Sequence, residues 1–208
     1  MEIDKKDIRA LTKLQLRDFF VAQGDQSFRG NQVYEWLWSK GAHSFEDMTN
    51  ISKATRTMLE ENFVINHIKV DQMQRSEDGT VKNAVRLHDG LVVESVLIPT
   101  NTRTTACVSS QVGCSLDCNF CATARLKRMR NLEPAEIYDQ VIAIDKESRL
   151  YYNHPLSNIV FMGMGEPLMN YNNVIKAIEM ITSEEGLGMS PKRITVSTAG
   201  IAKAIKRL

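Results

Sequence analysis

The 208-residue sequence predicts an α/β fold with three successive parts. Apolar residues recur at three- and four-residue spacing over residues 1–62, which indicates a helical domain. Short alternating runs over residues 63–100 predict an antiparallel β segment, and predicted strands alternate with predicted helices over residues 101–208. Strands alternating with helices are typical of a parallel α/β layer. We therefore place domain boundaries near residues 62 and 100.

The N-terminal pattern is that of a small helical bundle. Turn signals at Gly24, Gly30 and Gly41 separate its periodic stretches. Thr49 or Ser52 is a suitable N-cap for a further helix, because a side-chain oxygen at that position accepts from an otherwise unpaired backbone N–H.

The β segment contains three runs, HIKVDQMQ, KNAVRL and LVVESVLI, with Asp-Gly turn signals between them. They predict two or three antiparallel strands. The later part begins with a strand at 105–109. It continues as helix 134–146, strand 158–162, helix 173–183, strand 193–197 and helix 201–208.

Composition indicates an ordinary globular protein. There are 26 Lys and Arg against 25 Asp and Glu, so the chain has no net field that would attract nucleic acid over its whole surface. Any contact with RNA must come from local patches. No uncharged apolar window reaches the ~18 residues of a membrane span, and the first residues lack the pattern of a signal peptide. We expect a cytoplasmic protein with no membrane partner.

All four cysteines lie within one stretch of fifteen residues, which favours a metal site over a disulfide framework. Cys114, Cys118 and Cys121 have the spacing C-x3-C-x2-C. A structural zinc ion needs four protein ligands, and Cys107 is a possible fourth. Three thiolates also suit a [4Fe-4S] cluster with one iron left open. Both interpretations remain at this point.

The cysteine motif and its position after a predicted strand resemble the radical S-adenosylmethionine superfamily. This resemblance implies that the three cysteines ligate a [4Fe-4S] cluster whose open iron binds S-adenosyl-L-methionine. It also implies reductive cleavage of that cofactor to a 5′-deoxyadenosyl radical. Phe120, directly before the last cysteine, matches an aromatic position that packs near the adenine, although a plain packing role fits it equally well.

Further motifs narrow the resemblance to the RlmN-type dual-specificity RNA methyltransferases, which act on adenine C2, and their C8-methylating relatives. They extend over nearly the whole chain, in the same order. The resemblance implies an RNA-binding N-terminal domain and the first half of a partial (β/α)6 barrel. The matching segments are FRGNQVYEWLW (28–38), VVESVLIPT (92–100), ACVSSQVGCSLDCNFCATA (106–124), RNLEPAEI (130–137), NIVFMGMGEPLMN (158–170) and ITVSTAGI (194–201).

The resemblance assigns cofactor contacts to Gly165 and Glu166 at the end of the second parallel strand, and to Ser197 at the end of the third. Glycine permits close approach of backbone to a ligand, and a carboxylate can pair with the amino group of S-adenosylmethionine. Read without the cysteines, FMGMGEPL is also compatible with a tight turn and a solvated Glu. The assignment of Ser197 depends on the resemblance alone.

The resemblance also gives catalytic roles to two residues outside the ligand motif. Cys107 corresponds to the thiol that resolves a covalent protein–RNA adduct through a disulfide with a methyl-carrying cysteine. Glu94 corresponds to the proton acceptor. From the local pattern alone, Cys107 is a small buried hydrophobe and Glu94 is the outward residue of an alternating strand. We favour the catalytic roles because the family motif surrounds both.

The function implied is methylation of adenine C2 in 23S rRNA and in tRNA next to the anticodon, with a flavodoxin or ferredoxin as electron donor. Local support for RNA contact comes from basic residues after the cysteine loop and near the chain end. A C8-directed methyltransferase, another radical S-adenosylmethionine enzyme and a non-catalytic zinc or RNA-binding module are the alternatives. The basic residues are Arg125, Lys127, Arg128, Arg130, Lys203, Lys206 and Arg207.

The parallel layer has only three strand–helix units, and no cysteine follows Cys121 to carry the methyl group. We therefore expect a C-terminally truncated chain that is inactive by itself. A compact three-strand layer and a sheet completed by oligomerisation are the other possibilities.

Overall fold

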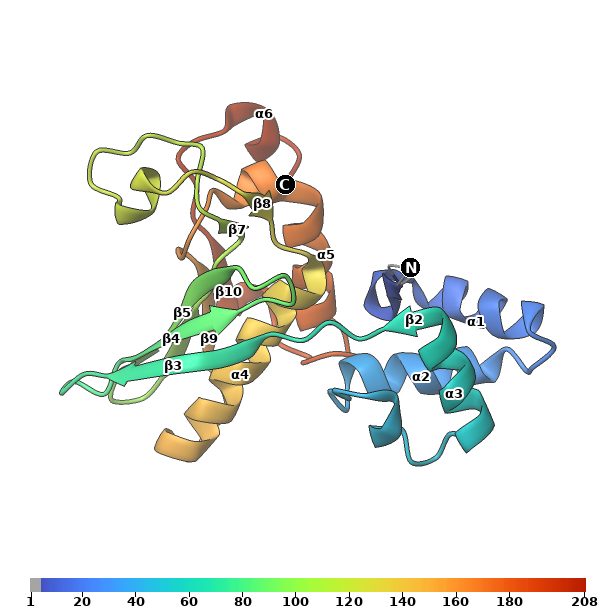
Figure 1. The fold of residues 1–208 in the computed structure, drawn as a ribbon. Coiled ribbons are helices and arrows are strands. Elements are labelled where there is room, and N and C mark those ends of the chain that lie inside the picture. The colour runs from blue at the N-terminus through green and yellow to red at the C-terminus, as the bar shows by residue number, and fades with distance from the viewer. Residues whose placement is uncertain (1–4) are drawn as a thin grey trace. The chain divides into compact units, whose positions relative to one another are not determined.

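A computed structural model describes residues 5–208, which form two compact units. One unit extends to His67 and includes Ser183–Gly188. The other comprises Ile68–Thr182 and Met189–Leu208. Figure 1 shows the elements of both units. Within residues 5–208, no helix has both the length and the apolar character needed to cross a bilayer.

The first unit is helical, as predicted. Its helices are α1 (Lys13–Ala22), α2 (Phe28–Trp38) and α3 (Lys53–Asn62), with short 3-10 turns at Ile8–Ala10 and Phe45–Asp47. Ser52 caps α3 by accepting from the Thr55 N–H. The pattern did not predict the parallel pair of β1 (Lys6–Asp7) and β2 (Phe63–Val64), because two-residue strands show no periodicity.

Gly30 lies inside α2, so its prediction as a turn is wrong. A Cβ at Gly30 would lie within 2.8 Å of the backbone of Leu16 and Arg17 in α1. The glycine therefore allows two helices to approach closely, which is a contact that no local pattern reports.

The second unit is built on one six-stranded sheet with the order β10-β9-β6-β5-β4-β3. The antiparallel half contains β3 (Lys69–Arg75), β4 (Val81–Arg86) and β5 (Val92–Pro99). The parallel half contains β6 (Thr104–Cys107), β9 (Asn158–Phe161) and β10 (Ile194–Val196). The pairing of β5 with β6 joins the two halves into one sheet. The sequence-predicted α/β class and all six of these strands are thus confirmed.

Helices cover one face of this sheet (Figure 1). They are α4 (Pro134–Tyr152), which contacts β5 and β6, and α5 (Tyr171–Thr182), which packs on α4. We predicted that α4 ends near residue 146, but it continues until Asn153 adopts a left-handed conformation. The helix predicted at 201–208 is a single short turn, α6 (Ala202–Ile205).

The two faces of the sheet differ in burial. One row across four strands comprises Leu97, Ala106, Ile159 and Ile194, and the first three of these are fully buried. The adjacent row points to the other face and comprises Val96, Cys107, Val160 and Thr195, which are half-buried or exposed. The chain's own helices therefore cover one face and leave the other open.

Replacement of Ile159 tests this difference between faces. Ile159→Ala should lower the free energy of unfolding by about 2–5 kcal/mol, because it leaves a cavity in the fully buried layer. Val160→Ala, one residue along the same strand but on the open face, should cost clearly less. Denaturant unfolding of both variants measures the difference. Equal losses would show that the second face is also packed.

Candidate active site

The predicted functional residues converge at one edge of the sheet. β6, β9 and β10 run parallel, so their carboxyl ends lie at the same edge. β6 leads into the cysteine loop, β9 into the turn that contains Gly165 and Glu166, and β10 into Ser197. The loops at the carboxyl ends of parallel strands are where α/β proteins bind ligands.

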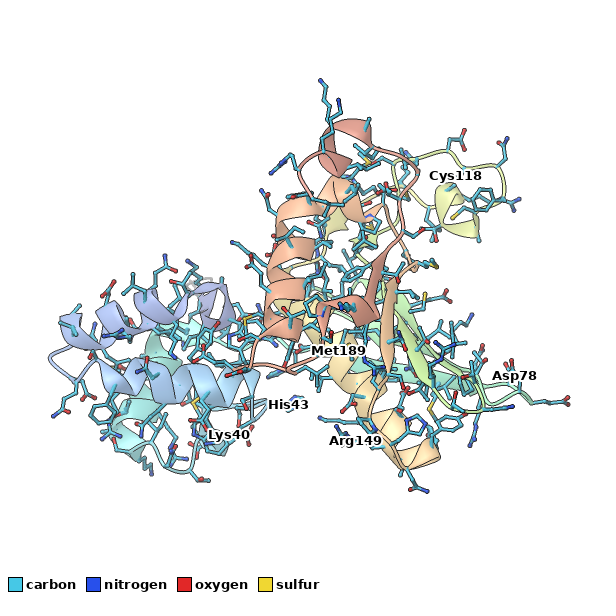
Figure 2. The ribbon with its side chains drawn as sticks, turned by 180° about the vertical axis from the view of Figure 1, so that it is seen from behind. Lys40, His43, Asp78, Cys118, Arg149 and Met189 are labelled. Atoms are coloured by element: carbon cyan, nitrogen blue, oxygen red, sulfur yellow. The ribbon has the colours of Figure 1, made fainter. Side chains whose placement is uncertain are left out.

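The cysteine loop lies between two short paired strands, β7 (Gln111–Val112) and β8 (Arg130–Asn131). It contains a 3-10 turn at Ala122–Arg125, and Figure 2 labels Cys118, which lies on the same loop before this turn. Gly113 begins the loop with a φ of 72°, and a Cβ there would collide with the backbone at Lys127. The two ends of the loop are therefore held directly against each other.

Cys114, Cys118 and Cys121 are free, half-buried thiols on this loop. The Cys114 Sγ accepts from the Leu116 N–H at 3.4 Å, and the Cys121 N–H donates to the Cys118 carbonyl at 3.0 Å. Over residues 5–208, no group of three or more His, Cys, Asp or Glu side chains is gathered closely enough to hold a metal ion. The structure thus places the three thiols on one loop without bringing them into a ligand cluster.

An ion-pair network fixes the end of the cysteine loop. Arg130 forms two 2.8 Å bonds with the buried carboxylate of Glu136 in α4, and its Nε donates to Asp89 at 2.5 Å. The bidentate bond to Glu136 raises the pKa of Arg130 despite partial burial. Burial opposes ionisation of Asp89, but bonds from Arg130 and the Leu91 N–H outweigh it and lower the pKa of Asp89. Arg130, predicted to contact RNA, is therefore occupied within the fold.

The turn after β9 packs tightly against the segment that precedes the cysteine loop. The Ser110 and Gln111 N–H groups both donate to the Met164 carbonyl, at 2.9 and 3.2 Å. Gly165 has a φ of 91°, and a Cβ there would overlap the Gln111 side chain. Glycine is therefore required at this position both for its conformation and for space.

Glu166 is 4% exposed, and both of its carboxylate oxygens accept backbone N–H groups. Oε1 accepts from Leu168 at 3.0 Å, and Oε2 accepts from Ala199, beyond β10, at 2.7 Å. The solvated Glu considered from sequence is therefore wrong. The carboxylate joins the loops that follow two neighbouring parallel strands.

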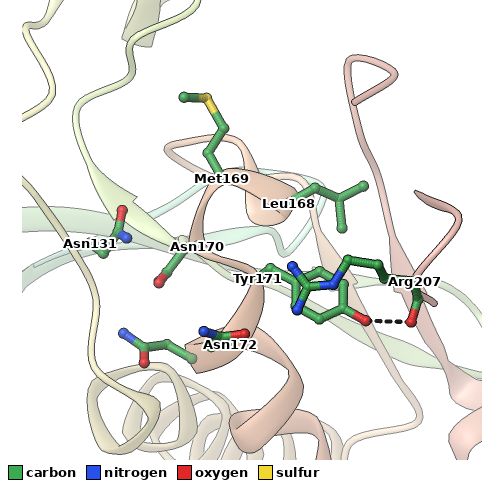
Figure 3. A pocket seen from close by; sticks show the side chains of 8 residues that line it. Asn131, Leu168, Met169, Asn170, Tyr171, Asn172 and Arg207 are labelled. Carbon is green, nitrogen blue, oxygen red and sulfur yellow. Dashed lines mark hydrogen bonds between the residues drawn. The ribbon is translucent and has the colours of Figure 1, made fainter. Parts of the chain in front are cut away.

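Ser197 is half-buried and follows β10 directly, close in sequence to the Ala199 N–H that Glu166 binds. A pocket is lined mainly by residues 168–173, which follow the β9 turn (Figure 3). The Arg207 guanidinium stacks 4.1 Å from the Tyr171 ring centre, and the Tyr171 hydroxyl donates to the Arg207 carbonyl. The pocket is rich in side-chain amides. It is lined by Asn131, Leu168, Met169, Asn170, Tyr171, Asn172, Asn173 and Arg207.

Cys107 and Glu94 both lie on the open face of the sheet. Cys107 pairs with Val96, and Glu94 is two residues from Val96 on the same strand, so the alternation of side chains places them on one side. Burial raises the pKa of the Cys107 thiol, although a hydrogen bond from the Met162 backbone opposes this. Glu94 is exposed and forms a 3.0 Å ion pair with Lys82.

Two family models match the chain. The model for the radical SAM superfamily matches residues 108–208, and the model "Ribosomal RNA large subunit methyltransferase N-terminal domain" matches residues 6–65. Together with the parallel strands and the three-cysteine loop, the match over residues 108–208 shows that this part of the chain is similar to the radical SAM superfamily.

The curated relatives narrow this similarity. The chain is 87% identical over all 208 residues to "Probable dual-specificity RNA methyltransferase RlmN" of Flavobacterium johnsoniae and 43% identical over 206 residues to "Dual-specificity RNA methyltransferase RlmN" of Geotalea uraniireducens. The chain spans only 60% and 58% of the length of these two proteins, respectively. Over its whole length, the chain is therefore similar to proteins named as RlmN-type dual-specificity RNA methyltransferases.

A solved structure agrees with this assignment. The fold matches "Crystal Structure of a radical SAM methyltransferase from Sphaerobacter thermophilus" with a TM-score of 0.86 and 35% sequence identity. The match covers 97% of this chain and 59% of that chain. The partial-barrel fold class is consistent with it.

The superfamily implies a [4Fe-4S] cluster and S-adenosyl-L-methionine as cofactors. The donor set fits the cluster, because three free thiols share one loop and soft thiolates are the preferred ligands of iron–sulfur clusters. A backbone N–H directed at the Cys114 sulfur is also typical of such ligands. The chain would have to draw the three sulfur atoms together when it binds the cluster.

Sequence reasoning missed the residues that connect these loops. They are Ser109, Gln111, Gln140 and Asn170, all buried and hydrogen-bonded between segments far apart in the chain. The SSQ run between Cys107 and Cys114 was a usable signal, since consecutive polar residues directly after a buried strand need internal partners.

A comparison of two glycines tests the close contact at the β9 turn. Gly165→Ala should destabilise the fold by more than about 2 kcal/mol, because it adds a steric collision to the strain of a positive φ. Gly90→Ala is the matched control, with a φ of 83° and nothing within 4 Å, so it should cost only about 1 kcal/mol. Thermal unfolding measures both. Equal shifts would mean that the turn does not press on Gln111.

Metal loading tests the ligand assignment. Replacement of Cys114, Cys118 or Cys121 by Ala should abolish iron binding and brown colour after anaerobic reconstitution, because each removes one of three ligands. Cys107→Ala should retain both. Absorption spectra and iron content per chain are the measurements. Loss of iron in the Cys107 variant, or a colourless protein with one zinc, would contradict the three-cysteine assignment.

Proposed function

We propose that the whole protein is a radical S-adenosylmethionine RNA methyltransferase that methylates C2 of adenine in 23S rRNA and in tRNA next to the anticodon. The names of its relatives support the reaction class. The observation that carries the proposal is the placement of Cys107 and Glu94 on one open sheet face, at the edge where the three-cysteine loop begins. Because its RNA substrates are cytoplasmic, we infer the same location for the protein.

The proposed cofactor site uses loops from all three parallel strands. Cys114, Cys118 and Cys121 would hold the cluster, and the backbone at Gly165 and the Ser197 hydroxyl would contact S-adenosylmethionine. When bound, the cluster supplies the electron that cleaves this cofactor and starts the radical chemistry that an electron-poor carbon such as adenine C2 requires. Glu166 would pair with the amino group of S-adenosylmethionine, and it also holds the loops after β9 and β10 together, since each of its oxygens accepts a backbone N–H.

Cys107 and Glu94 would complete the reaction on the open face. Glu94 would take the proton from the adenine carbon, and its exposed carboxylate lies on the same face of the sheet as Cys107. The Cys107 sulfur would attack the sulfur of the methyl-carrying cysteine, so that an S–S bond forms while the bond from that sulfur to the methylene carbon on the adenine breaks. The electron pair of the broken bond and the thiol proton complete the methyl group, and the RNA is released. Because burial raises the pKa of Cys107, its thiol keeps its proton at neutral pH until this step. No cysteine follows Cys121 in these 208 residues, so they do not supply the methyl carrier.

The cysteine loop also offers a surface for RNA. Arg125, Lys127 and Arg128 are exposed, as are the neighbouring Leu126 and Met129, and Phe120 is 95% exposed. Cationic side chains pair with phosphates, and an exposed aromatic ring can stack on an unpaired base. Lys203, Lys206 and Arg207 add positive charge near the pocket of Figure 3. The cluster also needs a reductant, which we propose to be a flavodoxin or ferredoxin.

The direct test uses the whole reconstituted protein with 23S rRNA fragments and tRNA. We expect 2-methyladenosine in digested RNA, detected by mass spectrometry. Cys107→Ala should accumulate a covalent protein–RNA adduct, because the resolving thiol acts after the carbon–carbon bond forms. Denaturing electrophoresis with labelled RNA detects the adduct.

Two outcomes would contradict the proposal. 8-Methyladenosine as the product would assign the protein to the C8-directed class. Normal methylation by the Cys107→Ala variant without any adduct would remove the catalytic role of this thiol and leave it as a packing residue. Cys118→Ala is the control, since an enzyme that lacks a cluster ligand should form neither product nor adduct.

A further inference from the structure

We infer that Ser109 is a positioning residue that couples the strand carrying Glu94 to the turn carrying Gly165 and Glu166. The inference rests on the proposed function for the roles of those residues. Ser109 is fully buried and lies two residues after Cys107. It is not one of the proposed ligands, bases or nucleophiles.

The Ser109 hydroxyl is bonded on both sides. It donates to the Glu94 carbonyl oxygen at 2.6 Å and accepts from the Met164 N–H at 2.8 Å. A single oxygen thus bridges β5 and the turn after β9, whose residues are far apart in the sequence. Both backbone groups depend on this oxygen, because a buried N–H or C=O without a partner is costly.

The position of this hydroxyl is itself fixed. The Ser109 N–H donates to Gln140 Oε1 at 2.9 Å, and the Ser109 carbonyl accepts from Gln140 Nε2 at 3.2 Å. Gln140 is fully buried in α4. On the opposite side, a Cβ at Gly163 would lie 2.7 Å from the Ser109 hydroxyl, so only glycine leaves room for the bridge. The helix, the strand and the turn therefore meet at one side chain.

This geometry ties the proposed base to the proposed cofactor turn. Glu94 lies on β5, next to the strand that ends at Cys107, and its backbone carbonyl is held by the same hydroxyl that orients Met164. Gly165 and Glu166 follow Met164 directly. Loss of the hydroxyl would leave β5 and the turn after β9 each intact. The two segments would no longer be held in a fixed position relative to each other.

Hydrogen exchange tests the bridge in the 208-residue chain without any cofactor. In Ser109→Ala, exchange of the Met164 amide should speed up roughly tenfold, which corresponds to the loss of one ordinary hydrogen bond. Ser95→Ala is the matched control, because Ser95 is also fully buried but its hydroxyl has no hydrogen-bond partner among residues 5–208. If Met164 exchanges no faster in Ser109→Ala than in Ser95→Ala, the bridge does not exist.

Functional coupling is tested in the whole enzyme. Ser109→Ala should raise the KM for S-adenosylmethionine and increase the fraction of protein trapped as RNA adduct, each severalfold, while Ser95→Ala changes neither. If Ser109→Ala does not fold, Ser109→Cys keeps the side-chain volume with weak hydrogen bonding and should shift both quantities in the same direction. A variant that loses stability but keeps the KM and the adduct fraction would reduce Ser109 to a structural residue.

The two experiments separate this inference from the proposed function. A wild-type enzyme that forms no methyladenosine, combined with selective exchange at Met164, would overturn the proposed function and retain the bridge. A wild-type enzyme that methylates RNA, combined with unchanged exchange in Ser109→Ala, would retain the proposed function and overturn the positioning role.

Discussion

The candidate site depends on the close packing of the turn after β9 against the segment between Cys107 and the cysteine loop. The contact is made largely by backbone groups. The Met164 carbonyl accepts from the successive N–H groups of Ser110 and Gln111, and Gly163 and Gly165 leave the space that this close approach requires. The interior there excludes water, so every polar group must find a partner within the protein. Ser109, Gln111 and Gln140 supply those partners. These hydrogen bonds, together with those of Glu166, align the carboxyl ends of β6, β9 and β10.

Two charged residues that the sequence assigned to ligand contacts also have structural roles. Glu166 uses both carboxylate oxygens to join the loops after β9 and β10, and Arg130 holds the end of the cysteine loop to α4. Buried polar groups need hydrogen-bond partners, and the Glu166 carboxylate and the Arg130 guanidinium both have them within the fold. The other side chains that the proposed function uses are the thiols of Cys107 and the cysteine loop, the Ser197 hydroxyl and the exposed carboxylate of Glu94.

The sequence predicted the fold better than the connections within the site. Strands and helices follow from the periodicity of buried residues, and Asp-Gly turns mark the hairpins, so β3 to β6, β9 and β10 were all predicted near their observed positions. Ends set by special conformations were missed, as at Asn153, where α4 continues to a left-handed residue. The roles of Ser109 and Arg130, and the close helix contact at Gly30, depend on partners distant in sequence, and no local pattern contains that information. The cysteine spacing was informative because ligands from one loop must be close in sequence.

The unequal faces of the sheet explain how one layer can be both stable and reactive. Ile159 and Ala106 on the covered face are sealed by α4 and α5 and supply hydrophobic stabilisation. Cys107 and Val160 on the other face belong to the same strands, so the same strand pairing holds their backbone, yet their side chains remain partly accessible. The backbone of a residue on the open face is held by the buried core on the other face, and its own side chain contributes little to that core. Substitutions on the open face can therefore alter chemistry with little loss of stability, whereas changes to the buried polar groups beneath it affect both.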